Sequence, residues 1–156
     1  MDNYEFLTPA GCPEVIVKQT IDASPKEIFK TVTDRRLIPK WWGPERLQTK
    51  VTKMDVRRGG QWRYIQRDTD GKEYGFHGVY HEVLPAKELV YTFEYEGMPG
   101  HVSMETITLE PKDGKTAVTE KIVFQSVEDR DGMLQDGMEE GGKESMERLE
   151  KLVTKH

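Results

Sequence analysis

Apolar and polar residues alternate through the middle of the chain, and turns interrupt them at short intervals. Over residues 47–124 the hydrophobic period is mostly two, which is typical of β-strands. Turn-forming residues occur at positions 58–60, 68–72, 85–88, 97–100 and 112–115. The connections between the strands are too short to hold crossover helices. The segment is therefore predicted to form six strands that pair in series as an antiparallel meander.

One further strand and two short helices are predicted before this meander. Residues 14–21 are rich in β-branched side chains and follow a segment, residues 1–13, that is expected to be irregular. Ser24-Pro25-Lys26-Glu27 is a capping box with proline at the first helical position, and Ile28, Phe29 and Val32 follow at helical spacing. A second helical turn is expected over residues 35–41, before Gly43-Pro44. The sheet then has about seven strands.

The sequence after Ser126 predicts a long final helix, because it is rich in helix-forming residues and contains no proline. Gly137, Gly141 and Gly142 oppose this, since each costs a helix interior about 1 kcal/mol relative to alanine. Either the helix begins only near Gly142, or the glycines let its backbone approach the sheet closely, which is the explanation we favour. The residues expected to share its buried stripe are Leu134, Met138, Met146, Leu149, Leu152 and Val153.

Length, charge and cysteine content exclude several functional classes. The 156 residues suit a single domain, and no apolar run approaches the ~20 residues that span a bilayer, so membrane insertion is not expected. The net charge is −5 with basic residues scattered among acids, which argues against binding nucleic acid. Cys12 is the only cysteine, so no internal disulfide forms. The N-terminus lacks a secretory pattern, and a cytoplasmic location is expected.

Five short motifs occur in the order found in one protein superfamily. They are Ile21-Asp22-Ala23-Ser24-Pro25, Trp41-Trp42-Gly43-Pro44, Asp55-Val56-Arg57-Arg58-Gly59-Gly60-Gln61-Trp62, Gly78-Val79-Tyr80-His81-Glu82-Val83 and Leu89-Val90-Tyr91-Thr92. With the predicted order of elements, they resemble the START-like, polyketide-cyclase-like (SRPBCC) superfamily, in its branch of homologues of the activator of heat-shock protein 90 ATPase. The resemblance covers residues 15–152. It implies an α+β helix-grip fold, a curved antiparallel sheet around a long C-terminal helix, as one domain over residues 1–156.

The resemblance does not carry a co-chaperone activity to this chain. The eukaryotic co-chaperones that give the branch its name have a second, N-terminal domain that contacts the chaperone, and these 156 residues leave no room for it. The final helix also departs from the common pattern, because Gly142 stands where a tryptophan usually follows the glycine. The resemblance does imply a cavity between the sheet and the final helix, which is common in the superfamily.

Aromatic residues recur at a spacing of two on the predicted strands, so they share faces of the sheet. These side chains either fill the core or line an apolar pocket, which a curved sheet and a single helix would leave open to small ligands. Five of the seven methionines, from Met98 onward, would give such a pocket an adaptable wall. We predict that the protein binds a hydrophobic or aromatic small molecule near Trp41, Trp42, Trp62, Tyr64, Phe76, Tyr91, Phe93 and Met138.

An enzyme is the first alternative. Glu120 is in phase with Val118, Ile122 and Phe124, so it faces inward with a raised pKa if they do, whereas a bulge in the strand would turn it to solvent. A cyclase- or hydrolase-like reaction would use Glu120 or Glu82 as base and Tyr80 or His77 as donor. We favour binding over catalysis, because no HExxH, paired CxxC, P-loop or GxSxG pattern is present, and no cofactor or metal is predicted.

The second alternative is a stress-related or chaperone-interacting protein that acts through its surface. Besides the strand edges, only the Trp41-Trp42 segment offers a plausible adhesive surface in the sequence. Exposure of these two indoles in the structure would favour this hypothesis.

Overall fold

The computed structural model describes residues 3–154. Residues 1–2 and 155–156, the two ends of the predicted domain, lie outside the described residues. The strands are β1 (Glu5–Leu7), β2 (Glu14–Ile21), β3 (Gln48–Met54), β4 (Gln61–Arg67), β5 (Glu73–Leu84), β6 (Glu88–Tyr95), β7 (Val102–Lys112) and β8 (Lys115–Val123). The helices are α1 (Pro25–Val32), α2 (Ile38–Trp41), α3 (Val127–Gln135) and α4 (Met138–Val153).

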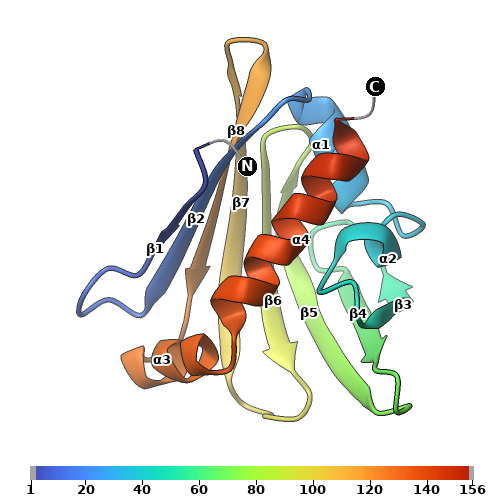
Figure 1. The fold of residues 1–156 in the computed structure, drawn as a ribbon, viewed down its shortest axis with the longest axis vertical. Coiled ribbons are helices and arrows are strands. Elements are labelled where there is room, and N and C mark those ends of the chain that lie inside the picture. The colour runs from blue at the N-terminus through green and yellow to red at the C-terminus, as the bar shows by residue number, and fades with distance from the viewer. Residues whose placement is uncertain (1–2, 155–156) are drawn as a thin grey trace.

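All the strands belong to one antiparallel sheet, in the order β1-β2-β8-β7-β6-β5-β4-β3. Strands β3 to β8 pair in chain order, which confirms the predicted meander of six strands. Strand β2 joins the sheet beside β8, with pairs running from Glu14 and Val123 to Ile21 and Thr116. Helix α4 crosses the inner face of the curved sheet, with α1 beside its upper part, α2 to its right and α3 at its lower end (Figure 1). The predicted α+β helix-grip fold is confirmed.

The sheet has eight strands rather than about seven, because β1 forms within the segment that was expected to be irregular. Glu5, Phe6 and Leu7 pair with Lys18, Val17 and Ile16 of β2. The strand is only three residues long and lies at the edge of the sheet. A segment this short contains too few residues to show a period of two, so its sequence does not distinguish it from a loop.

The N-cap predicted at the first helix is present, but within residues 3–154 only the serine half of the capping box forms, and the Glu27 carboxylate makes no return bond to Ser24. The Ser24 Oγ accepts a hydrogen bond from the Glu27 backbone N–H at 3.1 Å, and Pro25 occupies the first helical position. Ile28, Phe29 and Val32 are buried, as the helical spacing predicts. The second short helix, α2, ends at Trp41, so the chain delivers two tryptophans to the edge of the core.

The predicted single final helix is two helices that are separated at Gly137. Gly137 has φ +88°, in the left-handed region where glycine is favoured, and it caps α4. Neither explanation offered for the glycines holds. Helix α4 begins at Met138, well before Gly142, and a Cβ on Gly141 or Gly142 would meet no atom within 4 Å. Of the expected stripe, Met146, Leu149 and Val153 are buried, while Leu134, Met138 and Leu152 are half-buried.

The loop between α2 and β3 is tied to α4 by hydrogen bonds. The Gly43 N–H donates to Ser145 Oγ at 2.8 Å, and the Arg148 guanidinium donates to the Gly43 carbonyl at 2.7 Å. The Glu45 N–H donates to the Glu144 carboxylate at 2.8 Å. These contacts fix the loop over one end of the sheet. Within residues 3–154, the helices all lack the combination of length and apolar character that crossing a bilayer requires.

Candidate functional site

Trp42 lies at the centre of a cluster of aromatic rings on the inner face of the sheet. Its ring centroid is 5.0 Å from Tyr64, 5.3 Å from Phe76, and 6.5 Å from both Trp62 and Phe93. The contacts with Tyr64 and Phe76 are edge-to-face, an arrangement that aromatic pairs prefer. The Trp42 indole therefore contacts side chains of β4, β5 and β6.

A small void lies beside this cluster, under α1 and α2. Its volume is about 20 Å³, enough for about one water molecule. The Nε1–H of Trp41, which lines the void, is buried and makes no hydrogen bond within the described part of the chain. Burial raises the pKa of Tyr80, also in this wall, to about 12. The void is too small for an organic ligand.

A larger pocket, which we call the α3 pocket, lies between the sheet and α3. It has a volume of about 520 Å³, within the usual range for small-molecule sites. Its walls come from β4 to β7, the β6–β7 turn, the loop before β3, and α3 with the residues beside it. The apolar and aromatic residues of the wall are Leu47, Tyr74, Phe76, Phe93, Tyr95, Met98, Val102, Phe124 and Met133. Helix α4, which was expected to form one wall of the cavity, does not line it.

The polar residues of the α3 pocket divide into a buried pair and a rim. Gln66 and Ser103 are only 4% and 6% exposed, and they line the pocket from β4 and β7. The Gln66 amide donates a long hydrogen bond, 3.4 Å, to Thr49 Oγ1. At the rim, the His101 ring lies 3.0 Å from the Asp129 carboxylate. The other polar side chains at the rim are Arg46, Glu128 and Asp136.

Two carboxyl groups, Glu105 and Glu120, face the inner side of the sheet from β7 and β8. Glu105 is in phase with Ser103 and Ile107 on β7, and Ile107 pairs with Glu120 across the strands. The Tyr91 hydroxyl donates to Glu105 Oε1 at 2.9 Å. We call Glu105 and Glu120 the carboxyl pair. Glu105 lies two residues beyond Ser103 on β7, which is roughly 7 Å along the strand.

The surroundings of the carboxyl pair favour its protonated form. Although both residues keep some exposure, burial among protein atoms raises the pKa of Glu105 well above its usual value, and the charge of Glu120 raises it further. Burial also raises the pKa of Glu120. The Tyr91 hydroxyl, which is buried beside Glu105, has a raised pKa as well. The pair can therefore hold a proton at pH values where exposed carboxyls have lost theirs.

The eight predicted cavity residues fall into three groups. Phe76 and Phe93 line the α3 pocket. Met138 packs against the core but lines neither the pocket nor the void. The others surround the small void; they are Trp41, Trp42, Trp62, Tyr64 and Tyr91. Of the residues considered for catalysis, Glu120 and Tyr80 face the inner side of the sheet, but Glu120 meets Glu105 and Tyr91 rather than Tyr80.

His77 and Glu82 lie elsewhere, on the outer face of the sheet. His77 Nδ1 is 2.9 Å from Glu96, and its Nε2 is 3.3 Å from Glu94. Glu82 accepts from Arg58 at 2.8 Å. The structure does not bring either residue to Glu120.

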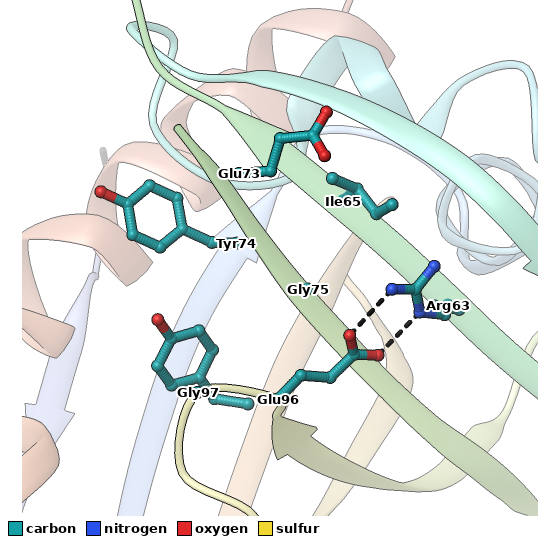
Figure 2. A pocket seen from close by; sticks show the side chains of 8 residues that line it. Arg63, Ile65, Glu73, Tyr74, Gly75, Glu96 and Gly97 are labelled. Atoms are coloured by element: carbon teal, nitrogen blue, oxygen red, sulfur yellow. Dashed lines mark hydrogen bonds and ion pairs between the residues drawn. The ribbon is translucent and has the colours of Figure 1, made fainter. Parts of the chain in front are cut away.

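An open hollow of about 300 Å³ lies on the outer side of the sheet. There Arg63 donates two hydrogen bonds to Glu96, at 2.7 and 2.8 Å (Figure 2). Hydrogen bonds from Arg63, with a smaller contribution from His77, lower the pKa of Glu96 to about 2. Arg63 binds Glu96 through both Nε and Nη2, so its charge is already paired with a carboxylate. The hollow is therefore explained by an ion-pair network that joins β4, β5 and the end of β6.

Sequence reasoning missed Glu105 and the residues that α3 contributes to the pocket. Glu105 could have been found, because it is in phase with Ile107 and Leu109, and Leu109 is buried. The pocket residues of α3 carried no such signal. Asp129, Gly132, Met133 and Asp136 form one helical face, but only Met133 among them is apolar. Within residues 3–154, no group of three or more His, Cys, Asp or Glu side chains is arranged to hold a metal ion.

Comparisons with known proteins identify relatives by sequence and by fold. Residues 22–154 match the profile of the family described as activator of Hsp90 ATPase homolog 1-like protein. The chain finds no match among curated proteins.

Several solved structures share the fold at low sequence identity. A protein from Arthrobacter aurescens has a TM-score of 0.89 at 22% identity, over 96% of this chain and 91% of that one. A protein from Mycobacterium smegmatis has a TM-score of 0.88 at 22% identity, over 97% of each chain. A protein from Chromobacterium violaceum has a TM-score of 0.83 at 23% identity, over 92% of this chain and 99% of that one. At this level of identity the similarity establishes the fold alone.

Proposed function

This chain belongs to the family of activator of Hsp90 ATPase homolog 1-like proteins, and we propose that it binds an apolar, aromatic small molecule in the α3 pocket. The observation that carries the proposal is the pocket itself, about 520 Å³ in volume and walled mainly by aromatic and aliphatic side chains. The two buried polar side chains, Gln66 and Ser103, are suited to orient a ligand by hydrogen bonding. We also propose that residues 1–156 form one domain and that the protein is located in the cytoplasm.

The flexible and rigid parts of the wall support the same proposal. Met98 and Met133 flank the pocket with unbranched side chains that repack at low cost. Phe76 and Phe93 are held by the ring of Trp42, so the inner wall is preformed. A preformed inner wall lowers the entropy lost on binding.

A glycine in α3 allows the pocket to be filled without disturbing its wall. Gly132 lines the pocket, and a Cβ there would meet no atom within 4 Å. We expect Gly132→Trp to place its indole in the pocket and to weaken binding of the neutral fluorescent probe N-phenyl-1-naphthylamine by about tenfold or more. The measurement is a fluorescence titration of the probe.

Gly142→Trp is the matched control. Gly142 is also helical, is exposed, has open space around its Cβ, and does not line the pocket. We expect this variant to bind the probe as the wild type does. Equal binding by both variants, with both folded by circular dichroism, would rule out the α3 pocket as the binding site.

The carboxyl pair supports a second candidate function, an acid–base enzyme of the cyclase or hydrolase type. Glu105, Glu120 and Tyr91 form a cluster with raised pKa values on the inner face of the sheet. In that case Glu120→Gln should abolish hydrolysis of 1-naphthyl acetate while leaving affinity for N-phenyl-1-naphthylamine unchanged. Wild-type protein that does not hydrolyse the ester above the buffer rate would count against this candidate.

Action through the surface, for example on a chaperone, has less support. It relied on exposure of the Trp41-Trp42 segment, and both residues are half-buried. The Trp42 ring is surrounded by four other aromatic rings, so it is not available as an adhesive surface.

A further inference from the structure

The rim of the α3 pocket carries more negative than positive charge. Glu128, Asp129 and Asp136 contribute three carboxylates from α3 and its ends, and Arg46 contributes one permanent positive charge. His101 is bound to Asp129, so any charge it carries offsets that carboxylate. Glu128 and Asp136 make no side-chain hydrogen bond or ion pair with another residue of the described range 3–154. Two carboxylates at the entrance are therefore available to a ligand.

The placement of these acids follows from the geometry of α3. Four residues occupy one face of the helix, because the last three follow the first by three, four and seven positions. They are Asp129, Gly132, Met133 and Asp136. All four line the pocket. Glu128 lies beside this face at the first turn and lines the pocket as well. The acids are thus directed along the entrance rather than spread around the helix.

The inner walls also favour a cation over an anion. Phe76, Phe93, Tyr74 and Tyr95 surround the pocket, and the negative faces of aromatic rings attract ammonium groups within about 6 Å. Gln66 and Ser103 offer acceptor oxygens at the buried end. The carboxyl pair lies one pleat step beyond Ser103 and adds no positive charge.

We propose that the α3 pocket selects ligands that combine an aromatic ring body with a basic nitrogen that is protonated at neutral pH. The ring lies against the wall that Phe76 and Phe93 form together, and the ammonium group lies at the rim, attracted by the carboxylates of Glu128 and Asp136. This inference rests on the proposed function, because it specifies the ligand class of the same pocket. It also predicts that aromatic acids of the same shape are rejected.

The test compares three probes of similar shape by calorimetry. They are the amine 2-(1-naphthyl)ethylamine, the alcohol 2-(1-naphthyl)ethanol and the carboxylate of 1-naphthaleneacetic acid. We expect the amine to bind about tenfold tighter than the alcohol, since two surface ion pairs of ordinary strength supply such a factor, and the acid to bind weakest. Raising the salt concentration should weaken binding of the amine and leave the alcohol unchanged.

Charge-neutral variants locate the effect. The double variant Glu128→Gln/Asp136→Asn should reduce the preference for the amine over the alcohol from about tenfold to about twofold or less. The control, Glu110→Gln/Asp113→Asn, removes the same net charge from exposed positions on β7 and the β7–β8 turn, at the opposite end of the sheet from α3 (Figure 1). It should keep the full preference.

The outcomes separate the inference from the proposed function. If the alcohol or the acid binds as tightly as the amine, or if the rim variant keeps the full preference, the inference is overturned while the pocket remains a binding site. If none of the three probes binds and N-phenyl-1-naphthylamine binds Gly132→Trp as well as wild type, both the inference and the proposed function fail.

Discussion

The proton of Glu105 is subject to opposing influences. The Tyr91 hydroxyl donates to the Glu105 carboxylate, which favours the charged form. Burial and the neighbouring charge of Glu120 favour the neutral form, and burial is the larger effect. The folded protein therefore binds this proton more tightly than the unfolded chain, whose glutamates have a pKa of about 4.3. This difference makes stability depend on pH.

The direction of that dependence follows from proton linkage. Below the pKa of the unfolded chain both states hold the proton, and Glu105 costs nothing. As the pH rises above about 4.3, the unfolded chain releases the proton and the folded chain keeps it, so the free energy of unfolding falls until the raised pKa of the folded state is passed. Every pKa unit of difference corresponds to about 1.4 kcal/mol.

We therefore expect Glu105→Gln to stabilise the protein increasingly as the pH rises from 4 to 8. The glutamine keeps an acceptor for Tyr91 and mimics the neutral carboxyl, and about 1.4 kcal/mol would appear as roughly 3 to 6 °C in Tm. Thermal unfolding followed by circular dichroism across this pH range is the measurement. The exposed Glu110→Gln is the control, with a constant difference from wild type. The same constant difference in Glu105→Gln would mean that Glu105 ionises normally.

At the scale of elements, the break between α3 and α4 depends on one backbone conformation. Gly137 is left-handed, whereas Gly141 is helical and surrounded by open space. We expect Gly137→Ala to lower the free energy of unfolding by about 1 to 2 kcal/mol, because a Cβ is disfavoured at positive φ. Gly141→Ala should raise it by about 0.5 to 1 kcal/mol. Both variants are measured by urea denaturation, and each serves as the control for the other. A change in the free energy of unfolding in the same direction for both would contradict this account.

Most elements were predictable because their signals are local. The N-cap at Ser24 and the turns of the meander need only a few adjacent residues. The missed features depend on distant contacts or on a single dihedral angle. Strand β1 exists only because β2 offers it an edge, and α3 and α4 separate only because Gly137 is left-handed. The register shifts between Val51 and Lys53 and between Tyr80 and Glu82 are of the same kind.

The candidate site was predicted less completely than the fold, for a physical reason. Period-two patterning correctly directs Phe76, Phe93 and Glu120 to the inner face, but it does not determine which inner residues are covered. Trp42 fills the space above β4 to β6, so the open volume is displaced toward α3. That displacement depends on how the loop after α2 docks, and the sequences of the strands carry no information about this docking.

At the scale of the molecule, Arg148 connects the final helix to this loop, more than a hundred residues earlier in the chain. Its guanidinium donates to the Gly43 carbonyl at 2.7 Å and to the Pro39 carbonyl at 3.3 Å. We expect Arg148→Ala to lower the free energy of unfolding by about 2 kcal/mol, because hydrogen bonds from charged groups contribute about 1.5 to 3 kcal/mol. Amide exchange of residues 42–47 should become faster, since the loop loses its anchor.

The comparison for Arg148→Ala is Lys151→Ala, an exposed position on the same helix without such contacts. Urea denaturation and hydrogen exchange measured by mass spectrometry distinguish the two. Because Leu47 of the anchored loop lines the α3 pocket, Arg148→Ala should also weaken binding of N-phenyl-1-naphthylamine. Identical exchange in the two variants would show that the loop is held by its other contacts.

The position of β2 in the sheet has a consequence for the order of events during synthesis. Its main partner, β8, follows it by about a hundred residues, and only the three pairs with β1 are available earlier. At about 5 to 20 residues per second, the ribosome delivers β8 roughly 5 to 20 s after β2. Throughout that interval Val15, Val17 and Ile21, which are almost completely buried in the finished sheet, have no native cover. Among the strands, β2 is thus the one that waits longest for its main pairing partner.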